Sequence, residues 1–246
     1  MSRLIFITVV RDPAMYASCL EKNPHANRHR LAPIDNRADN RPIPVRYNAF
    51  LDTLDDTADA WLIFCHEDFE PLEDALPLLE HADRNSLHGP IGARIRVVAG
   101  LLHLWQIAGH VETCEKDGTN PQSIGHPVPA GTLVDTFDCQ CLIVHTSLIA
   151  RHALRFDEKL PFDLYVEDFC IQAMEHHGIA SRILPWKSRH WSIHTAVPPS
   201  YAPALAYLNS KRTRRSYAGT SSYIGQPNAI QRLNAWAKGW IRKIWR

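Results

Sequence analysis

Short apolar runs alternate along the chain with polar segments that contain proline, asparagine and glycine. Residues 3–10 form a run rich in isoleucine and valine that ends at Arg11-Asp12-Pro13, so they predict a buried β-strand. Residues 60–65 form a similar run, which leads directly into His66-Glu67-Asp68. The predicted strands cover residues 3–10, 29–34, 60–65, 91–98, 136–145 and 180–185. The predicted helices cover residues 14–20, 45–54, 72–82 and 164–177.

Strand, helix and strand follow one another through the first half of the sequence. This order favours parallel strands joined by helical crossovers, so we predict an α/β fold with a mostly parallel, Rossmann-like central sheet flanked by helices. Residues 113–129 are rich in glycine, proline and polar residues and predict an exposed loop. We assign residues 1–210 to this domain and residues 211–246 to a separate basic tail.

The end of the tail, residues 229–246, has apolar residues at steps of three and four with lysine and arginine between them. This spacing predicts an amphipathic helix that follows the central domain. Two explanations of its apolar face stay open. It lies on an anionic membrane surface, with tryptophans inserted near the headgroups, or it packs on the protein body or on a second subunit.

The formal net charge of +1 conceals an uneven distribution over the 246 residues. Residues 211–246 hold nine lysines or arginines and no acidic residue, which leaves 18 basic and 26 acidic residues in 1–210. An acidic body argues against nucleic acid as its partner. No signal peptide or membrane span is predicted, so we expect a cytoplasmic protein whose tail can associate with the inner face of the membrane. The six cysteines are expected to be reduced packing residues.

His66 and Asp68 come directly after a buried strand, where ligands bind in open α/β sheets. A carboxylate there can hold Mg²⁺ or Mn²⁺, and such a cation can bridge the phosphates of a nucleotide. The alternative is a polar turn that ends the strand.

Glu167 and Asp168 lie together among apolar residues at the start of a predicted helix. Either can serve as a general base that deprotonates an acceptor hydroxyl. The alternative is that both complement the dipole at the start of the helix.

Further polar residues are candidates for the same site. His190 and His194 are separated by four positions and lie between prolines, and one neutral imidazole can complete a metal site. Arg11 and Asp35-Asn36 follow predicted strands, where their side chains can bind a base or a ribose, although surface turns also favour Asp and Asn.

The order of these motifs resembles glycosyltransferase family 2. The segments that carry the resemblance are Asp35-Asn36, Arg46-Tyr47-Asn48-Ala49-Phe50, WLIFCHED, FDLYVED and a late histidine, over roughly residues 3–195. The similarity is closest to a small glycosyltransferase-like branch in which His-x-Asp replaces Asp-x-Asp. It implies a GT-A fold, a nucleoside diphosphate sugar as donor, and inverting transfer to a hydroxyl of a glycan or of a lipid-linked acceptor in cell-envelope polysaccharide synthesis.

The resemblance also implies roles for individual residues. Asp68 corresponds to the second acid of the metal-binding signature, with His194 and then His190 as the late metal-ligand histidine. Asp168 corresponds to the usual base. Asn48 resembles the residue that holds the donor nucleotide. His66 stands where the family has an acid, so we group it with the donor-binding residues and leave open contact with the metal, the ribose or neither.

Two other classes of function stay open on the sequence. One is a different metal-dependent enzyme acting on nucleotides, with Asp68, Glu167 and Asp168 as ligands. The other is a nonenzymatic binding module with a decayed site. Binding of a nucleoside diphosphate sugar distinguishes a glycosyltransferase from both.

Overall fold

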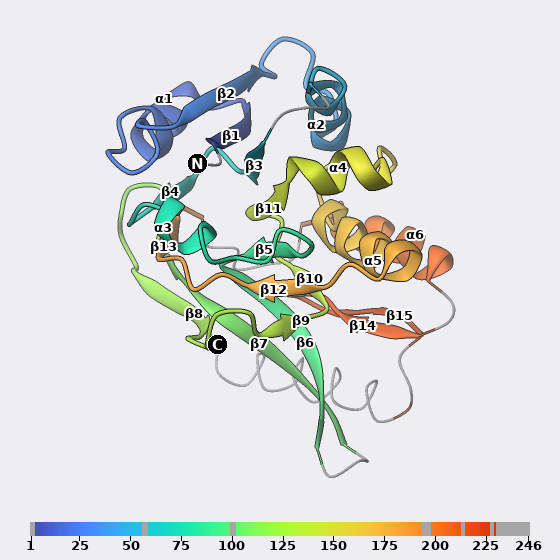
Figure 1. The fold of residues 1–246 in the computed structure, drawn as a ribbon. Helices are drawn as coiled ribbons and strands as arrows, with labels where there is room; N and C mark the ends of the chain where they lie inside the picture. Colours follow the sequence, from blue (N-terminus) through green and yellow to red (C-terminus); the bar gives the residue numbers. More distant parts are fainter. Residues whose placement is uncertain are drawn as a thin grey trace.

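The computed structural model describes residues 3–55, 59–98, 102–192, 198–212, 215–226 and 229. Its central element is a seven-stranded sheet (Figure 1). In spatial order the strands are β2 (Arg30–Asp35), β1 (Arg3–Val10), β3 (Ala60–Cys65), β11 (Cys141–His145), β5 (Leu87–Gly89), β12 (Ser181–Ile183) and β9 (Leu133–Val134). From the pairings, β2, β1, β3, β5 and β12 run in one direction, whereas β11 and β9 run in the other. The predicted α/β fold with a mostly parallel sheet is therefore confirmed.

A second sheet lies against the first and supplies one wall of the site. Its strands are β10 (Thr136–Phe137), β6 (Ile91–Val98), β7 (Leu102–Thr113), β13 (Ser188–His190) and β4 (Phe69–Pro71), with β8 (Gln122–His126) paired to β7. The long β6–β7 hairpin extends from the body at the bottom of Figure 1. A small hairpin, β14 (Ser216–Ala218) and β15 (Tyr223–Gly225), follows near the C-terminal end of the described chain.

Helices pack on the central sheet at both of its faces. They are α1 (Pro13–Tyr16), continued by the π-helical turn Ala17–Glu21, α2 (Ile43–Leu51), α3 (Leu76–Leu79), α4 (Thr146–His152), α5 (Tyr165–His177) and α6 (Tyr201–Lys211). Glycine ends α5 because Gly178 adopts a left-handed backbone (φ 68°) that closes the last turn.

Strand β3 is buried along its whole length, which explains its continuous apolar sequence. Successive side chains point to opposite faces. Leu62 and Phe64 therefore join a core with α2 and α5, whereas Trp61 and Ile63 join the core on the other face with Trp186. Burial on both faces fixes the register of β3 and hence the position of the residues that follow it.

Several sequence predictions differ from the structure. The strand predicted over 136–145 is divided into β10 and β11, because Asp138 Oδ1 accepts a hydrogen bond from the Gln140 backbone N–H and turns the chain between them. The helix predicted over 72–82 is a single turn, α3. The loop predicted over 113–129 contains β8 at residues 122–126.

Residues beyond 210 take part in the packed body. Tyr217 and Ile224 of the β14–β15 hairpin are buried in the same core as α5 and α6. The predicted amphipathic helix over 229–246 lies outside the described residues, apart from position 229. In the described part of the chain, no helix has the length and apolar character that a membrane crossing requires. The six cysteines are free thiols, as predicted, and five of them are buried.

Candidate functional site

Three side chains from different elements meet beyond the end of β3. His66 and Asp68 follow β3, and His190 ends β13. Strand β13 pairs antiparallel with β4, which aligns His190 with Phe69, and the Trp191 backbone N–H donates to the Asp68 carbonyl over 2.9 Å. One ligand atom from each of His66, Asp68 and His190 lies within 4.8 Å of the others. The tertiary structure therefore brings together residues that are more than 120 positions apart.

The contact between Asp68 and His190 has the character of two ligands that face a common ion. Asp68 Oδ1 and His190 Nε2 are 3.2 Å apart. Both atoms are shielded from solvent, yet neither has a partner in hydrogen-bond geometry. Burial favours a raised pKa for Asp68, but the charges of His190 and His66 hold this pKa below its ordinary value. Burial disfavours the charged form of His190 and so acts to lower its pKa. The charge of the Asp68 carboxylate outweighs this effect of burial, so the pKa of His190 is raised.

A hydrogen bond from His66 to Tyr165 determines the tautomer of His66. The Tyr165 hydroxyl donates its hydrogen to the Cys139 carbonyl over 3.0 Å, so it must accept from His66 Nε2 at 2.9 Å. Neutral His66 then has Nδ1 as its acceptor nitrogen, and this atom lies 4.0 Å from Asp68 Oδ1. Such a hydrogen bond to the second nitrogen typically orients a metal-binding histidine.

These three residues fit a divalent transition-metal ion. Two imidazoles and one carboxylate suit divalent transition metals, a group that includes Zn²⁺, Fe²⁺ and Mn²⁺. The buried Asp68 and His190 atoms without hydrogen bonds are the atoms that such an ion would satisfy. His66, which we predicted among the donor-binding residues, thus lies in the candidate metal cluster together with the predicted ligands Asp68 and His190. His194, the third predicted ligand, lies outside the described residues.

Glu167 is a buried carboxylate on α5, connected to His66 through hydrogen bonds of Cys139 and Tyr165. Its side chain is 3% exposed, and Oε2 accepts a hydrogen bond from Cys139 Sγ over 3.1 Å. Burial, with a contribution from the nearby Asp138 carboxylate, raises its pKa to about 8. A carboxylate with this pKa can exchange a proton near neutral pH.

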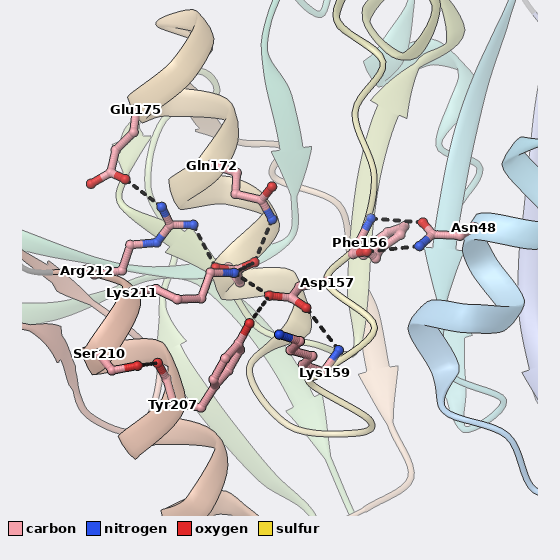
Figure 2. A network of polar contacts seen from close by, with 11 residues as sticks. Asn48, Phe156, Asp157, Lys159, Gln172, Glu175, Tyr207, Ser210, Lys211 and Arg212 are labelled. Carbon is pink, nitrogen blue, oxygen red and sulfur yellow. Dashed lines mark hydrogen bonds and ion pairs between the residues drawn. The ribbon is translucent and has the colours of Figure 1, made fainter.

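Asp168 points away from Glu167 into a different environment. Both of its carboxylate oxygens are engaged: Oδ1 accepts from Arg212 over 2.7 Å, and Oδ2 accepts from Lys211 over 3.0 Å and from Gln172 over 2.6 Å (Figure 2). Its side chain is fully buried. Adjacent positions on a helix are rotated by about 100° about its axis. Glu167 and Asp168, both predicted as catalytic residues, therefore face different surroundings.

The predicted donor-binding residues at the ends of β1 and β2 lie next to each other. Because β1 and β2 are parallel, Val10 is aligned with Asp35. Arg11 and Asp35 are exposed, and Asp35 forms an ion pair with Arg37 over 2.6 Å. Asn36 is buried instead. Its side chain bonds the backbone of Arg41 in both directions and shapes the loop that follows.

Asn48 connects two segments of the fold. Its amide donates to the Phe156 carbonyl over 2.9 Å and accepts from the Phe156 backbone N–H over 2.9 Å, as Figure 2 shows. A further bond reaches Glu158 at 3.0 Å. The side chain that the resemblance assigns to the donor nucleotide therefore joins α2 to the chain before α5.

Sequence reasoning missed two residues that shape the site. Glu67 accepts hydrogen bonds from the backbone N–H groups of Arg11 and Asp12 over 2.6 and 2.8 Å, and thereby ties the end of β1 to the end of β3. Tyr165 orients His66 as described. Glu67 lies inside the WLIFCHED motif and Tyr165 inside the FDLYVED motif. Nothing in the local sequence indicates which partner either side chain contacts.

A pocket of about 440 Å³ opens on the other face of β13. It is lined in part by Arg189 and Trp191, which flank His190 and point away from the cluster because side chains alternate along a strand. Arg189 pairs there with Glu112 over 2.7 Å. The pocket is thus separated from the metal cluster by one strand.

Comparison with known proteins finds solved structures with a similar fold but no protein with a similar sequence. No protein family and no curated protein matches the sequence. Similar solved structures include GalNAc-T7 with UDP, GalNAc and Mn²⁺ (TM-score 0.49, 8% identity, 86% of this chain and 49% of that chain) and S. aureus TarS (TM-score 0.48, 12% identity, 85% and 39%). A third is A197 from STIV (TM-score 0.40, 12% identity, 93% and 96%).

GalNAc-T7 and TarS are GT-A-type glycosyltransferases, the fold that the sequence resemblance implies. This chain spans about half of the first and less than half of the second. Because the TM-scores lie below 0.5 and the identities are 12% or less, the likeness concerns the path of the chain, and no activity is carried over from it.

Proposed function

We propose that this protein is a glycosyltransferase that moves a sugar from a nucleoside diphosphate sugar to an acceptor hydroxyl. The observation that carries the proposal is the cluster of His66, Asp68 and His190 beyond the carboxyl end of β3. The buried acid Glu167 is connected to it through hydrogen bonds of Cys139 and Tyr165. Ligands of open α/β sheets bind at this end of the strands. A bound Mn²⁺ or Mg²⁺ would stabilise negative charge on the departing diphosphate.

The nucleoside of the donor is assigned to the ends of β1 and β2. Arg11 and Asp35 are exposed there, at the ends of strands that lie on the side of β3 away from β11. Glu67 holds the turn after β1 through two backbone hydrogen bonds, so this surface is fixed before the donor arrives. Preorganised groups bind a ligand without the entropic cost of ordering them.

Glu167 is assigned as the base. The acceptor oxygen attacks the anomeric carbon while the bond from that carbon to the diphosphate oxygen breaks, and the acceptor proton passes to the Glu167 carboxylate. The nucleoside diphosphate leaves with the electron pair of the broken bond. Asp168, the base that the resemblance implies, has both carboxylate oxygens in ion pairs and hydrogen bonds within the protein. Direct attack without a covalent enzyme intermediate gives inversion at the anomeric carbon.

The acceptor that we propose is a glycan or a lipid-linked saccharide of the cell envelope. The basic, tryptophan-rich sequence of 229–246 supports a peripheral position at an anionic membrane, since lysine, arginine and tryptophan suit the headgroup region.

A second candidate function is a different metal-dependent enzyme that acts on nucleotides. Two histidines and one carboxylate also suit metals that activate water. Under this alternative a nucleotide is hydrolysed and no sugar reaches an acceptor.

Thermal unfolding with a panel of nucleoside diphosphate sugars, with Mn²⁺ or with chelator, tests the proposal. A ligand that binds only the folded state raises the Tm by mass action. We expect one donor to raise the Tm with Mn²⁺ and to lose this effect with chelator or in Asp68→Asn. If no donor raises the Tm in either condition, the protein does not bind nucleotide sugars and the proposal is wrong.

A further inference from the structure

Phe162 is exposed beside the metal cluster. Within the described part of the chain it is the one phenylalanine, tyrosine or tryptophan in the exposed class, at 45%. Its ring stacks on the His66 ring, with centroids 6.0 Å apart and planes 20° apart. An aromatic ring in this position presents an apolar face to whatever binds at the cluster.

The loop that carries Phe162, residues 157–164, is fixed at its first residue by a partly buried ionic network. Asp157 accepts hydrogen bonds from the Lys211 ammonium and, over 2.8 Å, from the Tyr207 hydroxyl (Figure 2). The same ammonium donates to Asp168 over 3.0 Å. The network thus links the start of the loop to α5 and to α6.

The loop is fixed at its last residue as well. Leu164 adopts a left-handed backbone (φ 64°) and is buried in the core, and α5 begins at the next residue. Non-glycine residues rarely adopt this conformation, so the packing around Leu164 must hold it. With both ends held, Phe162 is positioned before any ligand binds.

The position of Phe162 selects the ligand. Phe162 stacks on the candidate metal ligand His66, and the charge of the next residue, Asp163, contributes to the raised pKa of the Glu167 carboxyl. Because the proposed base Glu167 takes its proton from the acceptor, an aromatic ring near both the metal cluster and this base is available to the acceptor. The ring of a saccharide presents a face of C–H groups that fits an aromatic ring, and its hydroxyls project from the edge of the ring, from which one of them can reach a base such as Glu167.

We infer that Phe162 is the stacking platform for a saccharide ring of the acceptor, and that Asp168 is a positioning residue that holds this platform through Lys211 and Asp157. This inference rests on the proposed glycosyltransferase function for the role of the saccharide. It adds the acceptor subsite and gives Asp168 a task other than that of the base.

Saturation-transfer NMR with cellobiose, lactose and diacetylchitobiose, in the presence of UDP and Mn²⁺, tests the platform. We expect at least one disaccharide to receive saturation from the wild-type protein. Phe162→Ala should bind it about tenfold more weakly, and Phe162→Trp should restore binding. Leu133→Ala, which removes another exposed apolar side chain (54%) on β9, is the matched control and should bind like the wild type.

Hydrogen exchange tests the positioning role of Asp168. Asp168→Asn should accelerate exchange over residues 157–164 and weaken disaccharide binding, while Mn²⁺ still binds. If this variant does not fold, Lys211→Met serves instead, since it removes the link to Asp157 and keeps the pair of Asp168 with Arg212. Unchanged exchange and unchanged disaccharide binding in the variant that folds would refute the positioning role.

The outcomes separate the two proposals. If UDP binds with Mn²⁺ but no disaccharide binds, or if binding does not depend on Phe162, the platform is wrong and the proposed function is unaffected. If a disaccharide binds through Phe162 but neither UDP nor any nucleoside diphosphate sugar binds, the platform stands and the proposed glycosyltransferase is wrong.

Discussion

Arg212 donates to Asp168 across 2.7 Å in a contact that is closed to solvent, since the two side chains are 5% and 0% exposed. A second guanidinium nitrogen of Arg212 binds Glu175 over 2.6 Å, so the arginine bridges two acids of α5. Figure 2 shows this bridge between α5 and the end of α6. One of the two acids that the sequence singles out as a catalytic pair is thereby part of the attachment of the C-terminal segment.

The two neighbouring acids should respond differently to substitution. Glu167→Gln removes the proposed base and should lower kcat by roughly 10²–10⁴. It should change stability little below about pH 4.5 and increase stability above that pH, because burial opposes the charged carboxylate. Asp168→Asn leaves the buried Arg212 with one of its two carboxylate partners and should reduce the free energy of unfolding by about 3 kcal/mol or more. Steady-state kinetics and urea denaturation of both variants measure these effects. If Asp168→Asn retained full stability but abolished turnover, the base would be Asp168.

Metal binding should depend on each member of the cluster. Mn²⁺ alone should raise the Tm of the wild-type protein, and His190→Ala or Asp68→Asn should abolish the rise, because each removes one of only three ligands among the described residues. His152→Ala, on α4 away from the cluster, is the matched control. An equal Mn²⁺ effect in His190→Ala and His152→Ala would refute the cluster as a metal site.

The buried Glu167 should give stability a pH dependence of known sign. Its pKa is raised from 4.5 to about 8 in the folded protein, so the folded state holds a proton that the unfolded state has released. The stabilisation is complete below about pH 4.5 and is lost as the pH rises through about 8. Glu167→Gln should therefore become progressively more stable than the wild type between these values, by a difference on the order of 5 kcal/mol.

Urea denaturation of wild type and Glu167→Gln at intervals from pH 5 to 9 measures this difference. Parallel stability curves across that range would mean that Glu167 ionises normally and is not held protonated by burial.

Asp35 and Asn48 should give opposite results although both are predicted donor-binding residues. Asn48→Ala leaves the buried Phe156 backbone N–H without its acceptor and should cost about 1–3 kcal/mol of stability, with little change in donor affinity. Asp35→Ala, at an exposed position, should leave the Tm unchanged and weaken donor binding. Donor titration by calorimetry and thermal unfolding of both variants test this pair. A large loss of donor affinity in Asn48→Ala at unchanged Tm would restore the role implied by the resemblance.

The strands that the sequence predicts well are those with continuous apolar character. The prediction for 60–65 matches β3 residue for residue, and the prediction for 3–10 matches β1, because burial on both faces makes both runs almost continuously apolar. Strand β7 and helix α6 were not predicted. The sequence of β7 mixes histidine, glycine and glutamine with apolar residues, and its strand character comes from its pairing with β6, β8 and β13.

The sequence by itself determined the fold class and which short motifs carry ionisable groups, since apolar periodicity and residue type are local properties. Only the tertiary structure decided how these groups pair. The antiparallel alignment of β13 with β4 brings His190 to Asp68. The packing of α6 against α5 pairs Asp168 with Lys211 and Arg212. Glu167 instead stays buried beside Cys139. Contacts between residues far apart in the chain are absent from the local pattern, and they determine which acid is free to accept a proton.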